Sequence, residues 1–269
     1  CFPDVYEVGM SHLGTRILYH TINERKNTYC ERVFAPWPDM ETLMRKSDIK
    51  LFTLETKTPL DQFDMLGFTL QYEMSYTLNM LDMSGITIRA SERGEDEPII
   101  MAGGPCAYNP EPLYDIVDFF EIGEGEEMMD DVLEVYAKHK ANGKVNKKEF
   151  LREISHIGGI YVPSLYDVSY NEDGTIREFT PKYEDVPAKV KKRIVNNFDK
   201  VSFPDEMIVP YTDIVHDRVV LETARGCTNG CRFCQAGMIY RPVREKTTNT
   251  LIEQARKALK ATGYDEVSL

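Results

Sequence analysis

Three cysteines stand within eight residues of one another at the spacing C-x3-C-x2-C: Cys227, Cys231 and Cys234. They follow residues 219–223, a run typical of a strand. Thiolates are soft ligands that suit zinc or iron–sulfur clusters. A structural zinc site needs four ligands, and no fourth cysteine or histidine lies nearby in the sequence. The spacing therefore favours a [4Fe–4S] cluster held by three thiolates, with one iron left open for a substrate or cofactor.

This loop resembles the cluster loop of radical S-adenosylmethionine (radical SAM) enzymes. The resemblance includes the aromatic residue before the third cysteine, Phe233, and continues through residues 235–244. It implies that S-adenosylmethionine chelates the open iron, with Phe233 near it, and is cleaved reductively to methionine and a 5′-deoxyadenosyl radical. The implied protein is an enzyme that starts radical chemistry on an unknown substrate and needs an electron donor as partner.

Two other interpretations of the cysteines stay open at this stage. In the first, they hold zinc in a non-catalytic binding protein, and the fourth ligand comes from elsewhere in the chain or from a partner. In the second, the chain is an electron carrier whose cluster has no open iron. Metal analysis separates the first from a cluster enzyme, because it expects one zinc in place of iron and sulfide. A cluster spectrum that does not respond to S-adenosylmethionine would indicate the second.

The composition restricts the setting in which the protein works. The chain has 269 residues and a net charge of −12, so general nucleic-acid binding is not indicated. The remaining cysteines, Cys1, Cys30 and Cys106, are single and show no disulfide framework. No apolar run is long enough to cross a membrane. We therefore expect a cytoplasmic protein with no membrane partner, which suits an oxygen-sensitive cluster.

The first half of the chain alternates strand-like and helix-like runs. Strands are expected at residues 32–35, 63–70, 98–102 and 117–122, after a first strand that the chain start truncates. Helices are expected at residues 11–22, capped by Ser11, after Asp39, through Tyr76, and after residue 126. This rhythm predicts a flavodoxin-like, doubly wound parallel sheet over residues 1–142.

Glycines follow two of the predicted strands, at Gly103, Gly104, Gly123 and Gly125. Ligands bind at such strand ends in doubly wound sheets, although glycines there can also serve only to form tight turns. The layout resembles the cobalamin-binding domains that precede many radical SAM barrels. This resemblance implies a cobalamin site at these glycines and near Ser11 and His12. Tyr6 stands where a cobalt-ligating histidine would be, and His12 is the nearby alternative.

The rest of the chain divides into two predicted parts. Residues 143–216 are expected to be a linker with a short helix at 147–156 and a β-hairpin around the turn at 171–174. Residues 217–269 are expected to begin a radical SAM partial TIM barrel, with one helix at about 248–261 and the start of a strand. We expect the chain to be a fragment that is inactive alone. In the whole protein, bound cobalamin would make methyl transfer the leading reaction, and otherwise the first domain would serve docking or substrate recognition.

Five basic residues around the cysteine loop are the remaining candidates for a role at the site. Arg225, Arg232, Arg241, Arg244 and Lys246 either favour a negatively charged cluster and ligand or are solvated and paired with neighbouring acids. We expect Lys246 to be solvated. A separate basic run at 189–193 is expected to be a solvated face.

Overall fold

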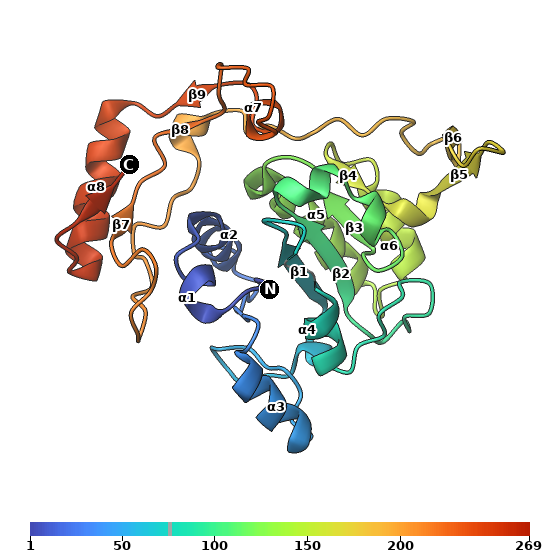
Figure 1. Cartoon of the computed structure of the whole chain (residues 1–269), viewed down its shortest axis with the longest axis horizontal. Helices are drawn as coiled ribbons and strands as arrows, with labels where there is room; N and C mark the ends of the chain where they lie inside the picture. Colours follow the sequence, from blue (N-terminus) through green and yellow to red (C-terminus); the bar gives the residue numbers. More distant parts are fainter. Residues whose placement is uncertain (75–76) are drawn as a thin grey trace.

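The computed structural model describes residues 1–74 and 77–269 (Figure 1). Its main sheet has the strand order β1-β2-β3-β4. Strands β1 (Met65–Thr69), β2 (Ile99–Gly103) and β3 (Phe119–Glu121) are parallel, and β4 (Ile160–Tyr161) is antiparallel to β3. The first four residues of β2 are buried, which explains its continuous apolar run. The predicted mixed α/β class with a parallel sheet is confirmed.

The chain start continues this sheet beyond β1. The Cys1 carbonyl accepts a hydrogen bond from the Thr69 amide at 3.1 Å, and the Phe2 amide donates to the Val33 carbonyl at 3.0 Å. Phe2 and Phe34 form a single parallel bridge. The strand predicted at residues 32–35 is therefore reduced to one bridging residue. Across the sheet, the segments follow one another in the order Phe34, Phe2, β1, β2, β3 and β4.

The helices agree with the predicted pattern more closely than their caps do. Helix α2 begins after His12, which caps it, so Ser11 is not the cap. Helix α3 begins after Trp37, and Asp39 lies in its first turn. The helix predicted through Tyr76 appears as α4, and Tyr76 itself lies outside the described residues. The bounds are α1 Tyr6–Gly9, α2 Leu13–Asn23, α3 Pro38–Lys46, α4 Leu78–Met83, α5 Gly125–Ala141 and α6 Lys147–Ile154.

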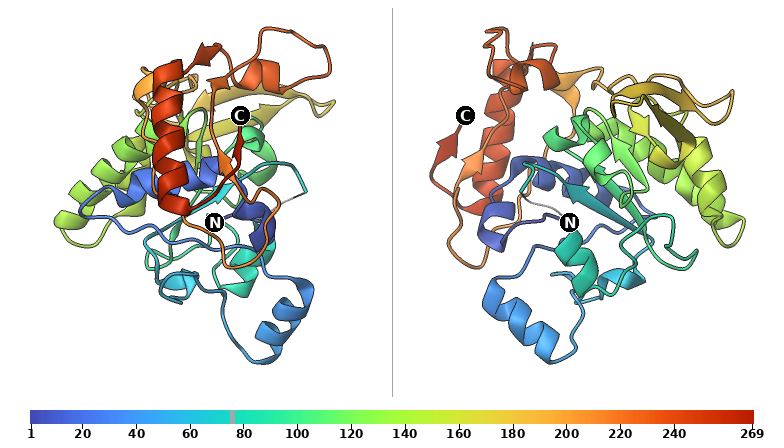
Figure 2. Two further views of the ribbon diagram at one scale, coloured as in Figure 1. Left: turned by 90° about the vertical axis from the view of Figure 1, so that its left-hand side faces the viewer. Right: turned by 45° about the vertical axis from the view of Figure 1, so that its right-hand side comes forward.

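Besides a small cluster of Phe2, Met10 and Phe34, two larger hydrophobic clusters hold the described part of the chain together. The larger surrounds the main sheet, where Phe68, Phe119, Phe120 and Phe150 are almost fully buried. Burial of apolar surface at roughly 25 cal/mol per Å² makes this cluster the main source of stability. A smaller cluster joins Ile17 of α2 to the C-terminal segment, through the residues Phe203, Met207, Val219, Leu221 and Ala258. Through this second cluster, α2 packs between the sheet domain and the C-terminal part (Figure 2).

The predicted hairpin of the linker is confirmed. Strands β5 (Tyr166–Tyr170) and β6 (Ile176–Pro181) pair antiparallel. Gly174 in the turn has φ +80°, a conformation that favours glycine. The hairpin extends away from the sheet domain (Figure 1). Short 3₁₀ helices complete the connections: η1 Leu60–Gln62, η2 Pro105–Tyr108, η3 Glu111–Leu113, η4 Pro163–Leu165 and η5 Phe198–Lys200.

The C-terminal part contains a helix between two parallel strands. Strand β7 (Val219–Val220) pairs in parallel with β10 (Val267–Ser268), and α8 (Thr248–Thr262) lies between them in the chain. Thr247 caps α8, and Gly263 ends it in the left-handed region at φ +75°. Strand β8 (Ala224–Arg225), helix α7 (Ala236–Ile239) and β9 (Arg244–Glu245) frame the cysteine loop. The strand predicted at 219–223 is shorter than expected. No helix among residues 1–74 and 77–269 is long and apolar enough to cross a membrane.

Candidate functional site

A cavity of about 1080 Å³ runs along β1 and reaches the carboxyl ends of the parallel strands. Its walls come from β1, β2 and β3, from α2, from residues on both the first and the last turns of α5, and from the segments 27–34 and 62–64. The segment 192–194 and two segments beside the cysteine loop, 224–226 and 239–241, also line it. One part of the cavity therefore lies where the sheet domain meets the cysteine loop, at the edge of the parallel sheet where ligands commonly bind.

Five of the six predicted cobalamin-site residues line this cavity: His12, Gly103, Gly104, Gly123 and Gly125. The sixth, Ser11, is not among the lining residues. Its hydroxyl donates to the Glu7 carbonyl at 2.7 Å and accepts from the His216 amide at 3.1 Å. Ser11 thus connects the first two helices to the C-terminal part.

The backbone fold requires glycine at two of these positions, whether or not a ligand binds. Gly123 has φ +127°, and a Cβ there would stand 2.2 Å from the Arg193 carbonyl oxygen, because the linker backbone pairs with Gly123. Gly104 has φ +99°, and its Cβ would stand 2.7 Å from the Leu70 carbonyl oxygen. Close backbone approach therefore explains glycine at both positions without any ligand.

His12 acts as a helix cap. Its Nδ1 accepts a hydrogen bond from the Thr15 amide at 3.1 Å, so the proton of the neutral ring lies on Nε2. Burial lowers the pKa of His12, which favours the neutral ring. Ligation of a metal through Nε2 would need that proton on Nδ1, and the cap would be lost. Tyr6, at the position of the missing cobalt ligand, packs its ring edge-on against Phe34 at 5.5 Å between centroids.

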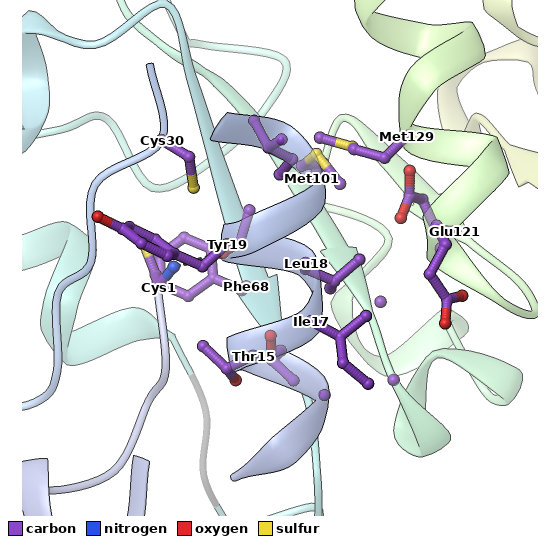
Figure 3. Close-up of a pocket in the computed structure, with 18 of the residues that line it drawn as sticks. Cys1, Thr15, Ile17, Leu18, Tyr19, Cys30, Phe68, Met101, Glu121 and Met129 are labelled. Atoms are coloured by element: carbon purple, nitrogen blue, oxygen red, sulfur yellow. Dashed lines mark hydrogen bonds between the residues drawn. The ribbon is translucent and has the colours of Figure 1, made fainter. Parts of the chain in front are cut away.

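Glu121, at the end of β3, is a site residue that the sequence reasoning missed. The residue is 5% exposed and lines the cavity, and its Oε1 has no hydrogen-bond partner (Figure 3). Its Oε2 lies beside two of the predicted glycines, 3.8 Å from a Cβ built on Gly103 and 3.3 Å from one built on Gly125. Burial, and then the charge of Glu126, raise the pKa of Glu121 to about 8. The sequence feature that could have indicated Glu121 is an acidic residue within the apolar run 117–122, which directly precedes Gly123 and Gly125.

The wall around Glu121 is mainly apolar. Leu18, Met101 and Met129 line the cavity near it, and Tyr19 and Cys30 lie farther along (Figure 3). Cys30 is a free thiol whose pKa burial raises to about 11, so it is a poor nucleophile. The wall can therefore accept an extended apolar surface, with Glu121 as a polar group buried in it.

An ionic network connects the cavity to both sides of the cysteine loop. Arg225 forms ion pairs with Glu126 and with Glu222, the latter at 2.6 Å. Arg244 binds Glu124 through both terminal nitrogens, one of them at 2.6 Å. Although burial acts to raise it, the hydrogen bonds from Arg244 and the Val195 amide hold the pKa of Glu124 below its usual range. The acids at the start of α5 thus hold β8 and β9, the two strands that flank the loop.

Two of the predicted solvated basic groups are instead packed. Lys246 is 6% exposed, with its ammonium 4.7 Å from the centroid of Phe203 and 5.3 Å from that of Phe198. Burial lowers its pKa. In the run 189–193, Lys192 is half-buried and donates to the Ile239 carbonyl at 2.9 Å. Local sequence could not predict this burial, because the covering residues come from distant segments.

The three predicted cluster ligands lie on the loop between β8 and α7. All three are free thiols, with Cys227 and Cys234 half-buried and Cys231 exposed. Gly226 precedes the loop at φ +96° and lines the cavity. Phe233 is 92% exposed. Within residues 1–74 and 77–269, no three His, Cys, Asp or Glu side chains are close enough to hold a metal ion, so the thiols are not gathered. The donor set is accessible and fits an iron–sulfur cluster chemically.

Comparison with known proteins places this α/β chain in a family. Residues 14–163 match the family described as radical SAM proteins, N-terminal, and the chain belongs to that family. An uncharacterized protein of Methanocaldococcus jannaschii is 24% identical over 274 residues, which cover 100% of this chain and 47% of that relative. The chain therefore spans about half the length of the relative.

One solved structure is also similar. It is a radical S-adenosylmethionine methyltransferase, TsrM, from Kitasatospora setae, with tryptophan substrate and the analogue aza-SAM bound. The match covers 99% of this chain and 46% of that one, at 13% identity and a TM-score of 0.48. A likeness of this size carries no argument about the function of the present chain.

Proposed function

We propose that the protein of which this chain is part is a radical SAM enzyme. The observation that carries the proposal is the loop with Cys227, Cys231 and Cys234, in a chain that belongs to a radical SAM family. These three residues would hold a [4Fe–4S] cluster. When bound, such a cluster supplies the electron that cleaves S-adenosylmethionine. Phe233, exposed on the same loop, is the proposed contact for that cofactor.

The residues around the loop would position it against the cavity. Arg225 and Arg244, two residues before and ten residues after the cysteines, are anchored on the acids of α5. The Tyr108 hydroxyl donates to the Ile239 carbonyl at 3.1 Å and adds a second anchor. These contacts support a site in which a ligand in the cavity lies next to the cluster, which radical chemistry on that ligand would need.

The finer interpretation is a flavodoxin-like sheet domain with a cobalamin site. The order Phe34, Phe2, β1, β2, β3 supports a doubly wound sheet, and the cavity reaches its carboxyl edge. At about 1080 Å³ the cavity is at the upper end of ligand pockets, which are typically about 300–1,000 Å³. Cobalamin bound there without a histidine ligand would make methyl transfer the proposed reaction. The parallel pair β7 and β10 would then begin the barrel.

The test uses the protein purified and reconstituted with iron and sulfide under anaerobic conditions. We expect about four irons and four sulfides per chain. The electron paramagnetic resonance spectrum of the reduced protein should shift on addition of S-adenosylmethionine, because the cofactor binds the open iron. Bound zinc with no iron would instead support a structural metal site. A cluster whose spectrum is indifferent to S-adenosylmethionine would support an electron carrier.

Cysteine variants sharpen this test. Cys227→Ala, Cys231→Ala and Cys234→Ala should each lose the cluster, because the remaining two thiolates cannot hold it. Cys106→Ala is the matched control, since Cys106 is also a free, half-buried thiol but lies on η2. Full iron content in any of the three loop variants would show that the ligand set is wrong.

A further inference from the structure

The cavity contains one feature that the proposed cluster chemistry does not use: the unpaired carboxyl of Glu121. A buried polar atom without a partner destabilises the fold, so such atoms are uncommon in folded proteins. The Oε1 of Glu121 is buried and has no partner, and the residue lines the cavity. A ligand in the cavity can supply this hydrogen bond.

The charges around Glu121 favour a neutral ligand group. On α5, Glu126 faces it and pairs with Arg225. On the linker, Arg193 pairs with Asp131 at 3.1 Å, and Lys192 is bound to carbonyls of the segment 239–241. On β2 and α2 the neighbours are Gly103 and Leu18, which carry no charge. Each of these charged groups is paired with another or bound to backbone carbonyls, so they favour no ionic ligand group.

A carboxyl in this setting is protonated at neutral pH, as its raised pKa of about 8 indicates. A protonated carboxyl offers one donor and one acceptor side by side. Its complement is a planar neutral edge with an adjacent acceptor and donor. A primary carboxamide has such an edge, and so does the amino-pyrimidine side of adenine.

We infer that the cavity binds a large, mainly apolar, neutral ligand, and that Glu121 anchors it by paired hydrogen bonds to a carboxamide or adenine edge. The volume of about 1080 Å³ and the wall of Leu18, Met101 and Met129 would contact the apolar body of the ligand. Only the choice of probes rests on the proposed function. The two sources of such an edge there are the carboxamides of a corrinoid and the adenine of an S-adenosylmethionine product.

The experiment measures equilibrium binding of two neutral probes, cyanocobalamin and 5′-deoxyadenosine, to the wild type and to two variants. Glu121→Gln keeps a donor and an acceptor at the same place, whereas Glu121→Leu removes both. At pH 6.5 we expect one probe to bind wild type and Glu121→Gln within about threefold of each other, and Glu121→Leu at least about tenfold more weakly. At pH 9.5, wild type should lose affinity and Glu121→Gln should not.

Several results would overturn the inference. One is that neither probe binds the wild type. Another is that Glu121→Leu binds as tightly as wild type. A third is that Glu121→Gln is as weak as Glu121→Leu, which would indicate a cationic ligand bound to a carboxylate. The variant Cys234→Ala should retain probe binding, and the iron content and spectrum are measured on the same samples. Failure of the cluster proposal is thereby distinguished from failure of the cavity proposal.

Discussion

Two buried acids lie at the two ends of β3, Asp118 just before the strand and Glu121 as its last residue, and their surroundings differ. Asp118 precedes the buried pair Phe119 and Phe120, and Glu121 follows it. Asp118 pairs with Arg93 at 2.7 Å and accepts a hydrogen bond from the Ile100 amide at 2.7 Å. Glu121 has one carboxyl oxygen without a partner and lines the cavity.

The difference teaches how to separate structural from functional buried charge. At Asp118 the cation is supplied by the chain, and the Arg93 side chain also donates to three backbone carbonyls, those of Thr87, Ile88 and Ile116. Every group there is satisfied within the fold. At Glu121 the fold supplies burial but no partner. Burial of a carboxyl group alone does not identify a functional site. Burial together with a carboxyl oxygen that lacks a hydrogen-bond partner and lies beside a cavity does.

The largest expected effect comes from breaking the ion pair between Asp118 and Arg93. Asp118→Leu leaves the Arg93 guanidinium buried without its counter-ion, and this should lower the free energy of unfolding by about 3–5 kcal/mol. Urea unfolding followed by circular dichroism measures it. The double variant with Arg93→Met should recover part of the loss. Equal losses in the single and double variants would show that the pair itself is not the cause.

The pH dependence of stability should show whether the pKa of Glu121 is raised in the folded state. The folded state holds the Glu121 proton up to about pH 8, whereas the unfolded chain releases it near pH 4.5. Stability of the wild type should therefore fall, relative to Glu121→Gln, as pH rises from about 4.5 to 8, by a few kcal/mol at most. Thermal unfolding of both proteins across this range measures the difference. Parallel pH profiles would mean that Glu121 titrates normally.

Replacing Glu121 should change the free energy of unfolding in the opposite direction to replacing Asp118. Glu121→Leu removes an unpaired buried group and should leave stability unchanged or raise it, by up to about 1–3 kcal/mol at pH 8. The urea experiment used for Asp118 measures this change under the same conditions. A loss of more than about 2 kcal/mol would mean that Glu121 has a structural partner.

The smallest expected effect tests another residue that lines the cavity. His12→Ala removes the Nδ1 acceptor that caps α2 and should cost about 1 kcal/mol, while His12→Asn should restore most of it. The Thr15 amide is the group left without its acceptor. Chemical unfolding measures both variants. A loss of the same size in His12→Asn would show that the tilted ring contact with Phe2, at 5.2 Å between centroids, matters more than the cap.

Much of the architecture could be predicted from local pattern. The apolar runs that became β1, β2 and β3, the turn before β6, and the α8 helix ending at Gly263 depend on period, turn residues and caps within a few positions. The cysteine loop was found in the same way, because three ligands lie within eight residues. The proposed boundaries at 142 and 216 and the roles of the site residues stay predictions.

The sequence by itself determined the strands, the hairpin and the order of chemical groups along the chain, since each depends on neighbouring residues. Tertiary structure alone decided which groups are buried and which are satisfied. Gly123 is needed because Arg193, seventy positions later, passes against it, and Lys246 is buried by Phe203, which lies in another segment. Glu121 stands out because no described segment of the fold brings its buried Oε1 a hydrogen-bond partner. Such facts depend on contacts between distant residues, which local pattern does not specify.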